Sequence, residues 1–168
     1  MLLRVIAALM FAAAGAVGGF SRADALKSDL ELCRETVELL RKSSILIRFQ
    51  GLNVYELSAR FRTSADLRRL TFLNDLPDGF SEGENFHELW KSAVSCQGNI
   101  PEEERRLLMN FGEIIGTSDI AGQLASIEAI TAELEAVEIR RRDDYIRKSR
   151  LYRSTGTLLG VMAGILII

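Results

Sequence analysis

The stretch that decides the fold is NFGEIIGTSD, Asn110–Asp119, which has two glycines four residues apart in a chain that otherwise has the pattern of helices. It comes close to the phosphate-binding pattern G-x-x-x-x-G-K-[ST], but it lacks the lysine and is one residue short. We therefore expect a corner between two helices rather than a nucleotide site. Gly116 is predicted to adopt the left-handed conformation that ends the first helix, with Thr117 or Ser118 as the cap of the second.

Gly112 precedes this corner by one helical turn and has no capping role. A glycine inside a helix costs about 1 kcal/mol relative to alanine. Its presence predicts that another helix approaches closely at this point. Asp119 is expected in the first turn of the helix that follows the corner.

On both sides of the corner, apolar residues recur at intervals of three and four, which is typical of amphipathic helices. The helix before it begins at Pro101, with Glu102 to Glu104 in its first turn. Its apolar positions are Leu107, Leu108, Phe111, Ile114 and Ile115. The helix after it runs from about Asp119 to Arg150, and its apolar positions are Ile120, Leu124, Ile127, Ile130, Leu134 and Val137.

Four further helices are expected upstream, and almost no strand pattern is present. A long helix over residues 26–47 ends at Gly51, and a short one opens at Asn53, which forms a capping box with Glu56. The next covers residues 65–76 with Thr63 or Ser64 as its cap, and the fourth covers residues 86–96. The sequence therefore predicts an all-α fold, a membrane-anchored bundle of about six helices.

Both ends of the chain are apolar and are predicted to be transmembrane segments that continue the first and last helices. Residues 1–20 contain a run from Leu2 that is about 28 Å long as a helix, close to the thickness of a bilayer core. Residues 154–168 are uncharged, and the part from Thr155 is about 21 Å long. This second segment spans a bilayer only if Leu151 and Tyr152 also enter it and Arg153 extends its charged end back to the interface. Residues 21–153 would form the helical bundle.

Basic residues flank the central region rather than the termini, which favours a cytoplasmic bundle with both termini on the other side. Arg4 is the exception. A cleavable signal peptide is the alternative for the N-terminus, with Ala23–Ala25 as a small-x-small site. The basic residues near the second segment are Arg140, Arg141, Arg142, Arg147, Lys148, Arg150 and Arg153. We expect them to set the topology and to contact lipid headgroups or a protein partner.

The two terminal segments also carry glycines four residues apart, which lets membrane helices approach closely. These glycines are Gly15 and Gly19 in the first segment, and Gly156, Gly160 and Gly164 in the second. We expect them to pack helix against helix, either between the two segments or between subunits of a homo-oligomer.

The composition argues against several classes of function. A net charge of -2 gives no electrostatic reason to expect nucleic acid as a partner. His87 is the only histidine, and no cysteine or aspartate lies near it at a spacing typical of metal ligands. Cys33 and Cys96 are expected to be buried and unpaired in a reducing compartment, and a bundle outside the cytoplasm would allow them to form a disulfide. We expect no enzyme activity, no cofactor and no metal.

The stretch LLMNFGEIIGTSD, the helix QLASIEAITAELEAVE and the C-terminal STGTLLGVMAGILII together resemble the stage III sporulation protein AB family. Five residues match the pattern of the corner: Phe111, Gly112, Glu113, Gly116 and Asp119. The middle of the chain, residues 51–99, has no distinctive match to this family.

This resemblance implies a subunit of the complex that links the mother cell to the engulfed forespore, similar to the cytoplasmic domains of type II secretion platform proteins. Its expected partners are the secretion-type ATPase called stage III sporulation protein AA and the other membrane subunits, and its expected place is the mother-cell membrane around the forespore. The alternatives are a generic membrane scaffold or sensor with the bundle outside the cytoplasm, and an enzyme with a nucleotide at the glycine corner.

Overall fold

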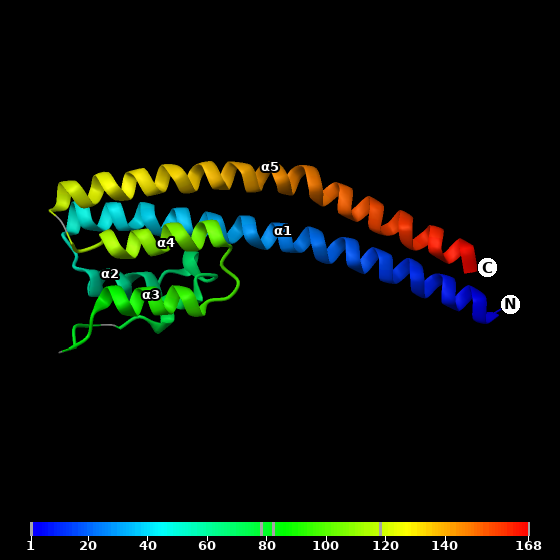
Figure 1. Cartoon of the computed structure of the whole chain (residues 1–168), viewed down its shortest axis with the longest axis horizontal. Helices are drawn as coiled ribbons and strands as arrows, with labels where there is room; N and C mark the ends of the chain where they lie inside the picture. Colours follow the sequence, from blue (N-terminus) through cyan, green and yellow to red (C-terminus); the bar gives the residue numbers. More distant parts are fainter. Residues whose placement is uncertain (1, 78, 82, 118, 168) are drawn as a thin grey trace. The chain divides into compact units, whose positions relative to one another are not determined.

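The computed structural model describes residues 2–77, 79–81, 83–117 and 119–167, and the side chains of these except 2–9, 11–12, 164 and 166–167. It contains five α-helices: α1 (Leu2–Gln50), α2 (Val54–Arg62), α3 (Phe86–Cys96), α4 (Glu102–Ile114) and α5 (Ile120–Ile167). Two short 3-10 helices, η1 (Ala65–Leu67) and η2 (Thr71–Asp75), connect α2 to α3 (Figure 1). The all-α prediction is confirmed, with five α-helices in the described chain instead of about six.

The chain divides into two compact units. The terminal unit comprises Met1–Leu30 and Ile139–Ile168, and the bundle unit comprises Glu31–Glu138. The helices α1 and α5 contribute residues to both units, whereas α2, α3 and α4 belong to the bundle unit alone.

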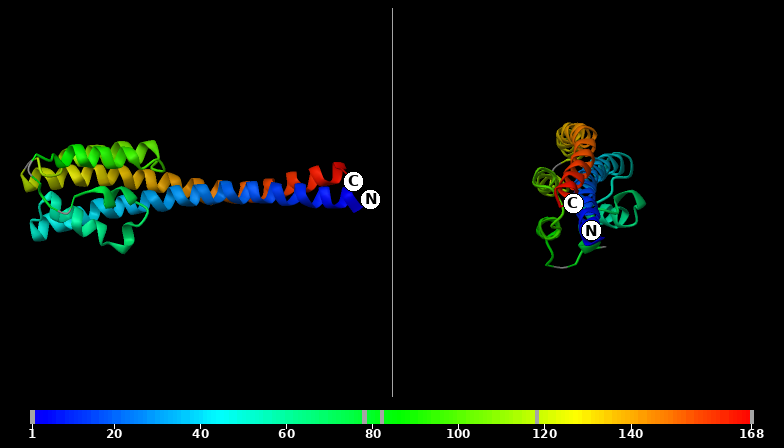
Figure 2. Two further views of the ribbon diagram at one scale, coloured as in Figure 1. Left: turned by 90° about the horizontal axis from the view of Figure 1, so that it is seen from below. Right: turned by 90° about the vertical axis from the view of Figure 1, so that its right-hand side faces the viewer.

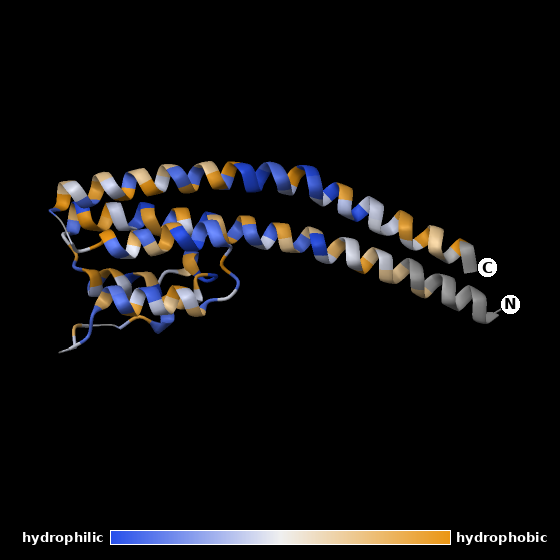
Figure 3. Cartoon of the chain, in the orientation of Figure 1, coloured by the Kyte–Doolittle hydropathy of each residue, from blue (hydrophilic) through white to orange (hydrophobic). Residues whose placement is uncertain are grey.

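The bundle unit is built around one hydrophobic core to which every helix contributes. Most of the predicted apolar positions of α4 and α5 are buried in it, Ile114 is partly buried, and the colours of Figure 3 show the hydrophobic residues spaced along each helix at helical intervals. Trp90 of α3 lies near the middle, with ring centroids 5.2 Å from Phe72 and 5.3 Å from Phe111. The helix α4 lies beside α5, where Arg106 pairs with Glu133 (Figure 2).

Local signals of the sequence end α1 and begin α2 as predicted. Gly51 has a φ of 61°, and its N–H donates to the carbonyl oxygen of Ile47 at 3.1 Å. Asn53 and Glu56 form the expected capping box, because the Asn53 side chain accepts from the N–H of Glu56 while the Glu56 carboxylate accepts from the N–H of Asn53.

The predicted helix over residues 65–76 is wrong, because polar side chains from elsewhere bind its backbone. Gln97 accepts a hydrogen bond from the N–H of Phe72 at 3.0 Å and donates one to the carbonyl of Arg69 at 2.7 Å. Glu35 accepts from the N–H of Arg69 at 2.7 Å. The Ser64 hydroxyl accepts from Lys42 instead of capping a helix. These contacts replace α-helical bonds, so the chain forms η1 and η2.

The two cysteines differ from each other. Cys33 is buried as predicted, and its thiol lies 3.9 Å from the carbonyl oxygen of Leu134. The prediction that Cys96 is buried is wrong, because this residue ends α3 on the exposed side. Both are free thiols.

Within the part of the chain that the structure describes, no helix has a stretch that is long and apolar enough to cross a membrane. The two predicted anchor segments fall partly outside that part, since residues 1 and 168, and the side chains of 2–9, 11–12, 164 and 166–167, are not described.

Candidate interaction surfaces

The glycine corner joins α4 to α5 in the bundle unit. Gly116 has a φ of 79°, the left-handed conformation that was predicted for it. The Thr117 hydroxyl donates back to the carbonyl of Ile114 at 2.8 Å, so Thr117 completes the end of α4 instead of capping α5. Asp119 is the capping residue, because its carboxylate accepts from the N–H of Gly122 at 3.3 Å. Ser118 lies outside the described residues.

Gly112 is buried where α4 meets α3. A Cβ atom at this position would lie 2.1 Å from Cδ1 of Trp90, so only glycine leaves room for the indole ring. The ring Nε1–H donates to the carbonyl of Leu108 at 2.8 Å. Nδ1 of His87 lies 2.6 Å from the carbonyl oxygen of Gly112, which requires that Nδ1 carries the proton. The only histidine therefore acts as a hydrogen-bond donor to α4.

The corner presents an exposed rim rather than a phosphate cradle. Glu113, Thr117 and Asp119 are exposed, whereas Phe111 is buried in the core. Ile120 was predicted to be buried with the α5 stripe, but it is 55% exposed because α5 only begins there. A shallow cavity of about 220 Å³ lies beside the corner, with Gly51, Val54, Ile115, Gly116 and Ile120 among its lining residues.

A larger groove of about 410 Å³ lies between α1 and α5 in the bundle unit, and the sequence reasoning missed it. Its apolar lining includes Ile45 and Phe49, which are 55% and 77% exposed, together with Ala132. The signal was present in the sequence, because both positions lie off the buried stripe of α1 and are nevertheless large and apolar. An exposed apolar groove with a charged rim is typical of a protein interaction site.

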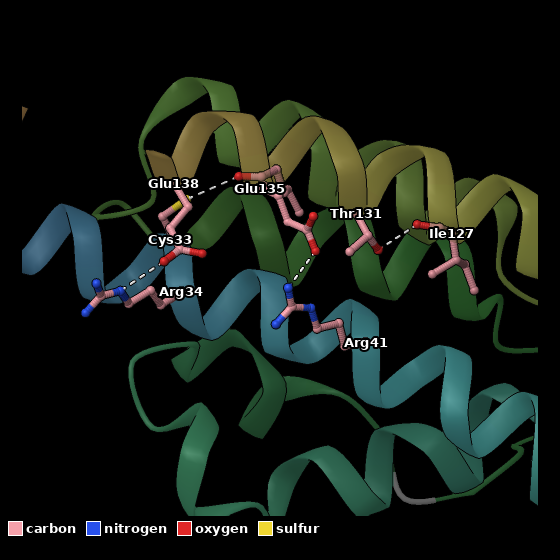
Figure 4. A network of polar contacts seen from close by, with 8 residues as sticks. Cys33, Arg34, Arg41, Ile127, Thr131, Glu135 and Glu138 are labelled. Carbon is pink, nitrogen blue, oxygen red and sulfur yellow. Dashed lines mark hydrogen bonds and ion pairs between the residues drawn. The ribbon is translucent and has the colours of Figure 1, made fainter. Parts of the chain in front are cut away.

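Three ion pairs between α1 and α5 join the helices of the bundle unit, and two of them border this groove. They join Arg34 to Glu138 at 3.1 Å, Arg41 to Glu135 at 2.6 Å, and Arg48 to Glu128 at 2.9 Å. The first two appear in Figure 4, beside the hydrogen bond from Thr131 to Ile127. Residue numbers rise along α1 as they fall along α5, so the helices run antiparallel. The hydrogen bond with Glu135 raises the pKa of Arg41.

In the terminal unit, α1 and α5 meet at glycines that the sequence singled out. A Cβ on Gly15 would lie 2.6 Å from the carbonyl oxygen of Gly156 and 2.7 Å from Cα of Gly160. A Cβ on Gly19 would lie 2.4 Å from the carbonyl oxygen of Tyr152. The backbones therefore approach each other directly. The surroundings of Gly164 lie outside the part that the structure describes.

The basic run on α5 lies in the terminal unit, and an aspartate of the same helix pairs with two of its residues. Asp144 pairs with Lys148 at 2.9 Å and with Arg147 at 3.7 Å. The hydrogen bond from Lys148 lowers the pKa of Asp144. Arg153 lies over the ring of Phe20, with 5.5 Å from its guanidinium carbon to the ring centroid. Arg140, Arg141, Arg142 and Arg150 belong to the same run, and Arg140, Arg142 and Arg150 are exposed.

The corner thus belongs to the bundle unit, and the glycines and the basic run belong to the terminal unit. Among the described residues, no group of three or more His, Cys, Asp or Glu side chains could hold a metal ion. Glu104, in the first turn of α4 as predicted, is fully buried.

Comparison with known families gives a match over nearly the whole sequence. Residues 4–168 match the family described as Stage III sporulation protein AB. The chain belongs to this family. The match includes residues 51–99, which sequence reasoning could not align, and membership in the stage III sporulation protein AB family implies a role in stage III of sporulation. Searches of the curated proteins and of the solved structures found no match.

Proposed function

We propose that the chain is a non-enzymatic platform subunit of the stage III sporulation complex between mother cell and forespore. Residues 1–20 and 154–168 anchor it in the mother-cell membrane, and the bundle faces the cytoplasm. There it docks a secretion-type ATPase, stage III sporulation protein AA, and other members of the complex. Family membership supports the setting, and the resemblance to type II secretion platform proteins supports the docking role.

The observation that carries the docking role is the groove between α1 and α5. Phe49 alone is 77% exposed, and burying a phenylalanine side chain is worth about 1.5–3 kcal/mol. The ion pairs Arg41–Glu135 and Arg48–Glu128 join the two walls at the rim, so a partner helix would meet an apolar surface bordered by charges. Aromatic residues of this kind often dominate the binding energy of an interface.

The terminal unit supports the anchoring role through its surface and its packing. Large apolar side chains are exposed along both helices, namely Met10, Val17, Phe20, Leu158, Leu159, Val161, Met162 and Ile165. The two helices meet backbone to backbone through small residues, which is how helices associate in lipid. In water this surface would expose a continuous apolar patch, whereas lipid would cover it.

The polar side chains of the bundle unit support a non-enzymatic role, because they serve structure. Arg105 donates to four carbonyl groups, those of Val94, Ser95, Gln97 and Ile100, and so closes the C-terminal end of α3. Gln97 binds the backbone of the 3-10 segment, and His87 binds that of α4. These groups already have partners inside the protein.

The proposal is tested in a strain that lacks the gene and carries a tagged copy on a second locus. Deletion is expected to block sporulation after engulfment, and the tagged wild-type protein should retain the ATPase on purification. Phe49→Asp should abolish this retention at normal protein levels. Phe80→Asp is the matched control, because Phe80 is 72% exposed but lies outside the groove. Normal spores from the deletion strain would refute the proposal.

The cytoplasmic placement is tested separately with a reporter inserted at residues 79–81, an exposed loop of the bundle unit. A fluorescent protein should fold there and alkaline phosphatase should be inactive. Active phosphatase at this site would place the bundle on the opposite side of the membrane and would favour the scaffold or sensor alternative.

A further inference from the structure

The terminal unit contains a basic cavity of about 490 Å³ at the boundary between its charged and uncharged stretches. Its lining residues are Phe20, Ile146, Ser149, Arg150, Arg153, Ser154 and Thr157. Arg153 is the last charged residue of the chain, and Arg22 is the first charged residue after the N-terminal apolar run. The lining therefore brings together two cationic side chains, three hydroxyl groups and one aromatic ring. We propose that it binds the headgroup of an anionic phospholipid, which rests on the membrane anchoring proposed above.

The charges in the cavity are available for an external anion. Arg147 and Lys148 of the same run share the carboxylate of Asp144, whereas Arg150 and Arg153 make no ion pair with any carboxylate in the described chain. Arg153 is held in position by the ring of Phe20, 5.5 Å from its guanidinium carbon. A preorganised guanidinium binds phosphate oxygens with two parallel hydrogen bonds, which a mobile one does less well.

The hydroxyl groups favour a headgroup that itself carries hydroxyls. Ser154 donates its proton to the carbonyl of Leu151 at 3.2 Å, and Thr157 donates its proton to the carbonyls of Ser154 and Arg153, at 2.9 and 3.1 Å. Both oxygens keep lone pairs that can accept a hydrogen bond. A glycerol headgroup supplies such donors, and choline supplies none. The chemistry of the cavity therefore matches phosphatidylglycerol.

Beyond the cavity, toward the uncharged stretches, both helices carry exposed apolar side chains, which the acyl chains of a lipid require. On α5 the lining residues recur every three or four positions, and the same helix face continues to Val161 and Ile165, both exposed. On α1 the face that carries Phe20 continues to Val17, which is also exposed. A lipid with its phosphate between Arg150 and Arg153 would lay its chains along these residues.

The test uses the full-length protein, purified in detergent and stripped of lipid, with binding of phosphatidylglycerol followed by native mass spectrometry. We expect phosphatidylglycerol to bind much more tightly than phosphatidylcholine. The double variant Arg150→Gln/Arg153→Gln should bind it about 30-fold more weakly, at about 1 kcal/mol for each basic residue near an anionic headgroup. Phe20→Ala keeps both charges and should weaken binding about two- to fivefold, because it only frees Arg153.

The matched control is Arg142→Gln/Arg147→Gln, which removes the same charge from the same helix outside the cavity. It should change binding less than twofold. An equal loss of phosphatidylglycerol affinity in both double variants would mean diffuse attraction to a basic helix and would overturn the proposal. Equally tight binding of phosphatidylcholine by the parent protein would also overturn it. Full competition by soluble glycerol phosphate would assign the cavity to a free phosphate ester and would also overturn it.

Failure of the lipid site can be told apart from failure of the anchoring. Alkaline carbonate extraction of membranes should leave the wild-type protein and both double variants in the pellet. Release of the wild-type protein would refute the membrane anchoring and the lipid site with it. Retention, combined with unchanged phosphatidylglycerol binding by Arg150→Gln/Arg153→Gln, would refute the lipid site alone.

Discussion

The helices α1 and α5 pair with each other in both units, but through different contacts. In the bundle unit they bury large side chains such as Leu40 and Leu134, and ion pairs such as Arg41–Glu135 border the contact. In the terminal unit the contact is made by Gly15, Gly156 and other glycines, with backbone against backbone. Two helices of one chain therefore meet through large side chains in one unit and through close backbone contact at glycines in the other.

The difference is the one expected if the bundle unit lies in water and the terminal unit in lipid, as proposed above. In water, burial of apolar area drives helices together at about 25 cal/mol per Å². In lipid this driving force is missing, because the acyl chains are as apolar as leucine, so helices associate through close van der Waals contact between small residues. The side-chain contact of the bundle unit suits the first case, and the glycine contact of the terminal unit suits the second.

The largest effect is expected from a bulky residue at the backbone contact. Gly15→Leu should separate α1 from α5 in the terminal unit, because neither neighbouring atom, the carbonyl oxygen of Gly156 or Cα of Gly160, can move aside as a side chain would. Spin labels at Ala13→Cys and Leu158→Cys, in a Cys96→Ser background, should show a narrow distance distribution in the parent protein and a broad one in Gly15→Leu.

The control for this experiment is another glycine of the same helix. Gly18 has no atom within 4 Å of where its Cβ would be, so Gly18→Leu should keep the narrow distribution. If Gly15→Leu also kept it, backbone contact would not be what holds the terminal unit together.

The second effect tests a glycine that meets a side chain instead of backbone. Gly112→Ala places a Cβ 2.1 Å from the Trp90 ring, which is held by its hydrogen bond to Leu108. Overpacking of this kind costs about 1–3 kcal/mol, partly offset by the better helix propensity of alanine. Chemical denaturation of the full chain should show this loss. Gly98→Ala should be close to neutral, because no atom lies within 4 Å of where its Cβ would be. Equal losses of stability in the two variants would contradict the contact between Gly112 and Trp90.

The third effect is the conformational cost at the corner. Gly116→Ala should destabilise the bundle unit by about 1–2 kcal/mol, because a left-handed φ of 79° is unfavourable for residues with a Cβ. Gly51→Ala is the comparison, since Gly51 has a φ of 61° and no neighbour within 4 Å of its Cβ position. The stability lost in Gly51→Ala measures the conformational cost alone. Any further loss of stability in Gly116→Ala measures the contact of the new Cβ with Val54. A neutral Gly116→Ala would contradict the left-handed corner.

The sequence predicted the elements that are determined locally. The end of α1 at Gly51, the capping box at Asn53 and the corner at Gly116 each depend on residues within one turn of each other. Helical periodicity likewise predicted the core positions of α4, because one buried stripe fully determines them.

The parts that the sequence did not predict depend on residues far apart in the chain. The helix expected over 65–76 is replaced because Gln97 and Glu35 bind its backbone, and nothing within that segment indicates these partners. The groove at Phe49 was missed because it needs α5 as its second wall. The capping residue of α5 was misplaced by one or two positions, which is within the usual uncertainty of helix ends.

The smallest effect is expected at the ion pairs of the bundle unit. Arg41 and Glu135 are 2.6 Å apart, but 55% and 42% of their side-chain surface stays exposed. Solvent screens such a pair, so its coupling energy should be about 0.2–1 kcal/mol. A double-mutant cycle with Arg41→Gln and Glu135→Gln measures it from denaturation at low and high salt, and the coupling should shrink as salt rises. Arg60→Gln is the control, because Arg60 is an exposed arginine without an ion pair in the described chain. Coupling well above 1 kcal/mol that does not change with salt would contradict a solvent-screened pair.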